Sequence, residues 1–262
     1  MIVGIIGLGT LGRAIALGLR DHTAVRALYG TNRCATPLAD HPYILILDGN
    51  RALVERSDVV VICVKPFQVE GVSREIASLL TPEKLVISCA ASVTIAQVQA
   101  WTGDRAPIVR AMPNMPCRIG EGMTVLARGV RATPEHLERA QSLFETLGRV
   151  AVIEEGLMDA ATGISGCGPA YAYVIIESLS DAGVKLGLPR DVARLLVAQT
   201  LMGSAKMVLT SDVHPAALKD DVTTPAGCTI DGLMEIEDGK LRHTLLRAAV
   251  AAARRSATLT SG

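Results

Sequence analysis

Three glycines near the start of the chain have a spacing that suits phosphate binding. The pattern G-x-G-x-x-G runs from Gly7 to Gly12, after an apolar, β-prone run at residues 2–6 and before apolar residues at helical spacing. In such a turn the first glycine permits the tight bend, the second lets backbone approach a pyrophosphate, and the third lets the helix pack on the strand. The N–H groups at the helix start then bind the phosphates. We therefore predict a dinucleotide site, with a purely steric glycine turn as the alternative.

The second chemical signal is the end of the next predicted strand, residues 25–29, which leads into Gly30-Thr31-Asn32-Arg33. An acidic residue at this point would accept a hydrogen bond from the ribose 2′-hydroxyl of NAD. Asn32 and Arg33 instead offer donors and a positive charge, which suit the 2′-phosphate of NADP. The alternative is that Arg33 is a solvated loop residue.

The third signal is a hydroxyl-rich stretch at residues 219–229, which precedes a helical pattern. Its proline and glycine make it a candidate nest for an anion such as a carboxylate. Ordinary helix capping by Thr224 or Thr229 is the alternative.

The available side chains also bear on the type of substrate. A dehydrogenase that acts on an alcohol needs an acid or base at the reacting oxygen, and the evident candidates are Lys65 and the hydroxyls of this loop. An imine needs a hydride, a held carboxylate and a hydrogen bond to nitrogen, and a threonine suffices for the last.

The elements that would position these residues follow two patterns. Up to residue 153 short apolar runs alternate with helices; after it the periodicity is helical. We predict an α/β fold: an N-terminal Rossmann-type, doubly wound, mostly parallel sheet at residues 1–158, and a second, all-helical domain for dimerisation and substrate at residues 159–262. Further strands are expected at residues 43–47, 59–64, 85–89, 107–111, 122–127 and 150–153.

The predicted helices of the second domain span residues 170–186, 190–209, 215–219, 229–237 and 240–259. The first two lack a clean polar face, which predicts burial in a subunit interface. Gly187 and Pro189 separate them, as a C-cap glycine and a proline at the first helical position.

Composition narrows the partners and the compartment. Lys plus Arg and Asp plus Glu are both 26, so the net charge is zero and gives no general reason to bind nucleic acid or an anionic membrane. Apolar runs such as residues 59–64 are too short to span a bilayer, and the first residues lack the basic region of a signal peptide. We expect a cytoplasmic protein. Its six cysteines form no C-x-x-C pair, so we expect reduced thiols and no metal site.

Other catalytic motifs are absent: the sequence contains no H-E-x-x-H, G-x-S-x-G or Walker lysine motif. The motifs that are present resemble, in order along the chain, those of the pyrroline-5-carboxylate reductase family. They are IIGLGTLG at the start, CVKP, SCAAS, SGCGPAY from Ser165, MGSAKM from Met202, and the late segment HPAALKD to TPAGCTI.

The resemblance implies NADPH-dependent reduction of pyrroline-5-carboxylate to L-proline, with hydride transfer to the cyclic imine carbon and NADH as a possible substitute. It also implies self-association through the helical domain, as dimers or larger rings such as decamers. It assigns the cofactor to three groups of residues: Ile6, Gly7, Leu8, Gly9, Thr10, Leu11 and Gly12 at the pyrophosphate; Asn32, Arg33 and Asn50 at the adenosine end; and Cys63, Val64, Lys65, Pro66, Cys89, Ala90 and Ala91 at the nicotinamide. Asp221 is also assigned to the cofactor.

The same resemblance places Glu155, Thr224, Gly227, Cys228 and Thr229 at the substrate, with Thr229 as the catalytic residue whose hydroxyl faces the ring nitrogen. The loop departs from the usual Ser-Pro-Gly-Gly pattern of the family at Thr224, Ala226 and Cys228, and Asp221 stands where an amide or apolar residue is frequent. An alanine in place of glycine restricts the backbone angles of an anion nest.

Three alternatives remain open. The first is a reductase of the same build that acts on a six-membered or substituted cyclic imine carboxylate. The second is a β-hydroxyacid dehydrogenase, although no lysine follows Gly168 until Lys185. The third is a non-catalytic NADP sensor, against which the hydroxyl-rich loop offers a second small-molecule site.

Overall fold

The structure is a computed structural model that describes residues 1–20, 22–32 and 43–258. The chain forms two compact units: unit 1 is Met1–Cys167 with Val250–Gly262, and unit 2 is Gly168–Ala249. Residues 159–167, which were predicted to begin the second domain, belong to unit 1, where Ala161 packs against the core and Thr162 is buried. The assignment of cofactor and substrate roles to two separate domains stays a prediction.

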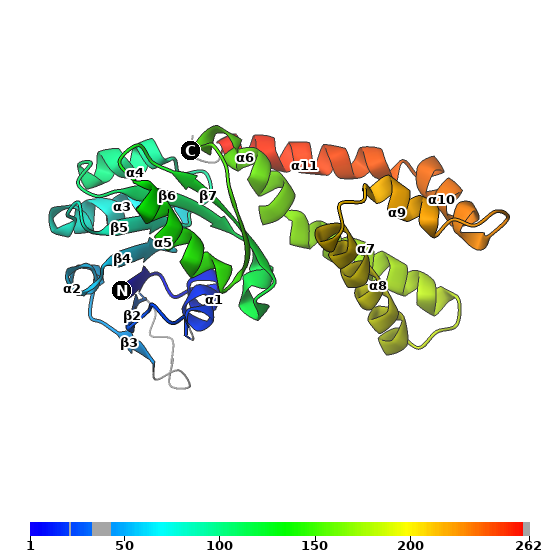
Figure 1. Ribbon diagram of the computed structural model, residues 1–262, viewed down its shortest axis with the longest axis horizontal. Coiled ribbons are helices and arrows are strands. Elements are labelled where there is room, and N and C mark those ends of the chain that lie inside the picture. Colours follow the sequence, from blue (N-terminus) through cyan, green and yellow to red (C-terminus); the bar gives the residue numbers. More distant parts are fainter. Residues whose placement is uncertain (21, 33–42, 259–262) are drawn as a thin grey trace. The chain divides into compact units, whose positions relative to one another are not determined.

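The described strands of unit 1 form one eight-stranded sheet in the order β3-β2-β1-β4-β5-β6-β7-β8 (Figure 1). All neighbours pair in parallel except β6 and β7. The strands are β1 (Ile2–Ile6), β2 (Ala27–Thr31), β3 (Ile44–Ile46), β4 (Val59–Ile62), β5 (Leu85–Ser88), β6 (Ile108–Pro113), β7 (Gly122–Arg128) and β8 (Gly148–Val152). The strand order reverses between β1 and β4, and ligands of such sheets bind at the carboxyl ends beside that point.

Helices cover both faces of this sheet. They are α1 (Thr10–Gly18), α2 (Asn50–Arg56), α3 (Pro66–Ile76), α4 (Ile95–Thr102), α5 (Pro134–Glu145) and α6 (Met158–Ala161), with the short helices η1 (Ala77–Leu79), η2 (Met115–Ile119), η3 (Glu155–Leu157) and η4 (Thr162–Gly166). Val59 and Val61 pack with residues of α1 and α5, whereas Val60 and Ile62 pack with residues of α2, α3 and α4. Because both faces are covered, β4 is a continuous apolar run. The predicted Rossmann-type fold is thus confirmed.

Strand β2 begins two residues later than predicted, at Ala27. The Val25 N–H donates to His22 O in a turn, and the chain joins the sheet only at Arg26, whose N–H donates to Met1 O. The strand ends at Thr31, whose carbonyl oxygen accepts from N–H groups of the glycine turn.

Unit 2 is helical. It contains α7 (Gly168–Lys185), α8 (Arg190–Thr210), α9 (Pro215–Asp221), α10 (Cys228–Asp238) and the first part of α11 (Leu241–Thr258). Helices α7 and α8 form a hairpin whose turn includes Gly187 at φ 95°. Pro189 is the N-cap of α8 and not its first residue, contrary to the prediction.

The long helices of unit 2 expose large apolar side chains in the single chain, and their burial in a subunit interface stays a prediction. Leu195 is 67% exposed and Met202 59% exposed on α8. By length and composition alone, α8 is the one helix of the described chain that could cross a membrane. An apolar helix that packs against another subunit has the same length and composition, so these two features do not by themselves indicate a membrane span.

Candidate active site

The glycine turn after β1 is tied to the end of β2. Gly7 has φ 98°, and its N–H and that of Leu8 donate to Thr31 O at 3.0 and 3.2 Å. A Cβ on Gly7 would lie 2.9 Å from Cys63 O, so this position requires glycine for both its angle and its space. The turn is thereby fixed against β2 and against the end of β4.

The start of α1 offers open N–H groups. Gly9 is the N-cap, so no capping side chain covers the start of the helix. A Cβ at this position would meet no atom within 4 Å. A Cβ on Gly12, by contrast, would lie 2.0 Å from Gly7 O. The first intrahelical donor is Arg13 N–H, which bonds Gly9 O at 2.9 Å. The preceding N–H groups have no acceptor within the helix and form a site for an anion such as a pyrophosphate.

Two consecutive hydrogen bonds between side chains lie where the adenosine end of the cofactor was predicted. Thr31 Oγ1 donates to Asn50 Oδ1 at 2.7 Å, and Asn50 Nδ2 donates to Glu75 Oε2 at 2.8 Å. Asn50 begins α2 and is therefore held beside the end of β2. Asn32 follows β2 and is exposed. The predicted contact of Arg33 lies outside the described residues.

The two segments predicted at the nicotinamide follow neighbouring strands. Cys63, Val64 and Lys65 follow β4, with Pro66 at the first position of α3. Residues 89–94, here called the 89–94 loop, connect β5 to α4 and include Cys89, Ala90 and Ala91. The Cys89 N–H donates to Ile62 O at 2.9 Å, which keeps both segments at one edge of the sheet.

Buried thiols underlie this edge. A side-chain hydrogen bond with Cys63 and burial raise the pKa of Cys89 above its usual range. Burial raises the pKa of Cys117 to about 11. Both groups are therefore neutral thiols at neutral pH and poor nucleophiles. All cysteines of the described chain are free, as predicted; Cys34 lies outside it.

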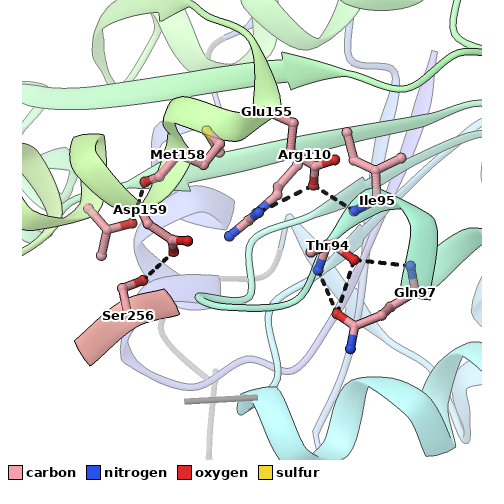
Figure 2. A network of polar contacts seen from close by, with 9 residues as sticks. Thr94, Ile95, Gln97, Arg110, Glu155, Met158, Asp159 and Ser256 are labelled. Carbon is pink, nitrogen blue, oxygen red and sulfur yellow. Dashed lines mark hydrogen bonds and ion pairs between the residues drawn. The ribbon is translucent and has the colours of Figure 1, made fainter. Parts of the chain in front are cut away.

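Sequence reasoning missed a buried ion pair in unit 1. Figure 2 shows Arg110 on β6 pointing at Glu155, whose Oε1 lies 3.2 Å from Arg110 Nη1 and accepts from Ile95 N–H at 2.7 Å. Arg110 is 3% exposed. The available signal was a single charged residue within an otherwise apolar strand, because buried charges are rare unless paired. Glu155, predicted at the substrate, is thus held by Arg110 and the start of α4.

The remaining predicted substrate residues lie in unit 2, where a turn leads into α10. The Gly227 N–H donates to Thr224 O at 3.0 Å, and Ala226 adopts φ 58°. Gly227 is the N-cap of α10, without a side-chain cap. Capping by Thr224 or Thr229, the alternative drawn from the sequence, is not what the structure shows. The N–H groups of Cys228 and Thr229 occupy the first turn, where intrahelical acceptors are lacking.

Three predicted residues of unit 2 differ in their position and exposure. Asp221 is the exposed last residue of α9 in unit 2, whereas the glycine turn belongs to unit 1. Thr229 is half-buried on the first turn of α10, and Cys228 beside it is exposed. Unit 2 therefore offers two helix-terminal N–H groups and a threonine hydroxyl on one turn, which suit a small carboxylate.

The strand order, the glycine turn and the open start of α1 define a Rossmann-type dinucleotide-binding protein. Residues 2–92 match a family model described as NADP oxidoreductase, coenzyme F420-dependent. Residues 155–259 match one described as pyrroline-5-carboxylate reductase dimerisation, which supports self-association.

Whole-chain comparisons narrow this class to a family. The pyrroline-5-carboxylate reductase of Glycine max is 40% identical over 98% of this chain and 95% of its own. That of Methanosarcina acetivorans is 36% identical over 98% of this chain and 97% of its own. A crystal structure of the Plasmodium falciparum pyrroline carboxylate reductase with NADP bound superposes with a TM-score of 0.90 at 34% identity, covering 98% of this chain and 97% of that one. This chain belongs to the pyrroline-5-carboxylate reductase family, which confirms the resemblance.

Proposed function

We propose that this protein reduces pyrroline-5-carboxylate to L-proline with NADPH, the last step of proline biosynthesis. The observation that carries the proposal is the full-length similarity to enzymes of that name, at 36–41% identity over nearly the whole chain. The glycine turn supports it from the structure, because its open N–H groups and the free space at Gly9 fit a pyrophosphate.

The cofactor would be held by unit 1. Residues Gly7 to Gly12 would bind the pyrophosphate through backbone N–H groups, and Asn50 with residues 31–33 would bind the adenosine end. The segments at residues 63–66 and 89–91 would border the nicotinamide. The described residue that directly follows β2 is Asn32, which is not acidic, and this favours a 2′-phosphate and therefore NADPH over NADH.

Unit 2 would bind the substrate. The Cys228 and Thr229 N–H groups would bind its carboxylate at the positive end of α10, with Thr224 assisting. We assign the Thr229 hydroxyl to the ring nitrogen, where its oxygen accepts a hydrogen bond from the N–H of the protonated imine. The Gly227 N–H takes a lesser part, because it already donates to Thr224 O. Asp221, which was predicted at the cofactor, also lies in unit 2. Glu155, which was predicted at the substrate, lies in unit 1, where Arg110 and Ile95 N–H are its partners.

Catalysis would rest on positioning and on fixed dipoles rather than on a strong acid or base. When bound, NADPH supplies the hydride that adds to the imine carbon. The substrate reacts as the N-protonated imine, so hydride addition to the carbon turns the C=N bond into a C–N bond. The nitrogen keeps its proton and gains a lone pair, and the product is the neutral secondary amine. Thr229 hydrogen-bonds that nitrogen throughout. The neutral thiols of Cys89 and Cys117 take no part as nucleophiles.

The exposed apolar faces of α7 and α8 would be covered by a second copy of the chain. The match of residues 155–259 to a dimerisation model and the exposure of Leu195 and Met202 support this. Assembly of dimers into a decamer and a cytoplasmic location are further proposals.

The test is to assay a panel of substrates, each with NADPH and with NADH, and to measure turnover as the loss of the absorbance of the reduced nicotinamide. We expect turnover with pyrroline-5-carboxylate and preference for NADPH. Faster turnover of the six-membered homologue or of a β-hydroxyacid would favour the corresponding alternative enzyme, and NADPH binding without any turnover would favour a sensor.

A further inference from the structure

The 89–94 loop forms one boundary of the proposed cofactor site. Cys89 is bonded to the end of β4 through Ile62 O, and a Cβ on Gly7 at the end of β1 would touch Cys63 O and Val64 Cγ1, both at 2.9 Å. The ends of β1, β4 and β5 therefore follow one another along the sheet edge. The position of the loop after β5 sets the space left for the nicotinamide.

This loop has a conformation that its own residues do not favour. Ser92 is 5% exposed and has φ 64°, a left-handed angle for a residue other than glycine. Such angles persist where surrounding contacts fix them. Ala90 and Val93 are each 2% exposed, so the loop is packed into unit 1 on both sides of Ser92.

Glu155 fixes the far end of the loop. Its Oε1 accepts from Ile95 N–H, the first residue of α4, at 2.7 Å (Figure 2). A carboxylate at this end of a helix is favoured by the helix dipole. Thr94 and Gln97 also bond each other, but that capping box is internal to the helix start. The carboxylate of Glu155, in contrast, attaches α4 to a segment sixty residues away in the sequence.

Arg110 holds that carboxylate in place. It belongs to β6, pairs across the sheet with Ser88 at the end of β5, and lies 3.2 Å from Glu155 Oε1 through Nη1. Because the Arg110 side chain is 4% exposed and that of Glu155 is 29% exposed, solvent screens the pair little. The sheet, η3 and the start of α4 are thus joined at one oxygen atom.

We propose that Arg110 is a positioning residue for the cofactor. Through Glu155 it holds the start of α4, and thereby the 89–94 loop, in the shape that receives the nicotinamide. The inference rests on the proposed function because it takes NADPH as the cofactor. It assigns Glu155 to Arg110 and α4 rather than to the substrate.

The experiment compares Arg110→Met with Arg131→Met in the full chain. Arg131 pairs with Asp104 at 3.1 Å on the surface of the same unit, so its variant loses an ion pair away from the loop. We expect Arg110→Met to raise the Kd for NADPH, measured by calorimetry without substrate, about tenfold, or about 1.4 kcal/mol. Hydrogen exchange of residues 89–98 in the cofactor-free protein should become faster. The kcat at saturating NADPH should change much less, and Arg131→Met should match the unaltered protein in all three.

Two further variants keep the test decisive if Arg110→Met does not fold. Arg110→Lys retains a charge near Glu155 and should recover most of the NADPH affinity. Glu155→Asp keeps the charge but withdraws the carboxylate from Ile95, and it should weaken NADPH binding.

Three outcomes would overturn the positioning role of Arg110: an unchanged Kd for NADPH with unchanged exchange, a rise confined to the KM for pyrroline-5-carboxylate, or equal effects of Arg110→Met and Arg131→Met. An unaltered protein that binds no NADPH would instead refute the proposed function.

Discussion

Substitution of Gly9 should change the affinity for NADPH and leave the free energy of unfolding nearly unchanged. A methyl group at this position meets no protein atom within 4 Å, and φ is −70°, an angle that any residue adopts. Alanine is a poorer N-cap than glycine by about 0.5–1 kcal/mol. The lower entropy of the unfolded alanine chain returns about 0.4–1 kcal/mol. We therefore expect the free energy of unfolding of Gly9→Ala to stay within about 1 kcal/mol of the original.

The same methyl group would occupy the space through which a pyrophosphate approaches the start of α1. Displacement of the phosphates by one methyl radius would weaken one charge-assisted hydrogen bond, worth about 1.5–3 kcal/mol. The Kd for NADPH should therefore rise roughly tenfold to hundredfold.

Gly12→Ala is the matched comparison. Its Cβ would lie 2.0 Å from Gly7 O, so it should lower the free energy of unfolding by about 1–3 kcal/mol or more through overpacking. Urea unfolding and calorimetric titration with NADPH measure the two quantities separately. NADPH affinity of Gly9→Ala within about twofold of the original would refute the placement of the phosphates at this helix start.

The remaining predictions concern the substrate loop, the thiols and the helical unit. Thr229→Ala should lower kcat about tenfold to hundredfold by loss of one hydrogen bond to the reacting ring, whereas Thr229→Ser should keep most of the rate in a steady-state assay. Ala226→Gly should raise the free energy of unfolding by up to about 1 kcal/mol in urea, because alanine at φ 58° is strained, and lower stability would contradict that reasoning. The pKa of Cys117 is raised from 9.0 to about 11, so unfolding, which frees the thiol to ionise, should become easier as the pH rises through this window, and Cys117→Ala should show a shallower decline in unfolding scans. Leu195→Glu, at a side chain 67% exposed on α8, should shift the protein toward monomers in analytical ultracentrifugation, whereas Val130→Glu, at a side chain 94% exposed in unit 1, should not.

Local patterns in the sequence carried the order of elements and the identity of the cofactor turn. The apolar run at β4 and the glycine spacing before α1 are signals within a few residues, since a buried strand must be apolar and a tight turn must contain glycine. The family motifs are local in the same sense. The fold class, the family and the position of the glycine turn could therefore be predicted before any tertiary contact was known.

The tertiary structure decided what depends on residues far apart. The register of β2 follows from Arg26 bonding Met1, and the N-cap of α10 is Gly227 because the preceding turn closes on Thr224. The partner of Glu155 is Arg110, forty-five residues earlier, through a contact that no periodicity records. The sequence around a glutamate does not show whether its carboxylate contacts a substrate or a buried arginine. That role depends on the charges and N–H groups that folding brings close to the carboxylate.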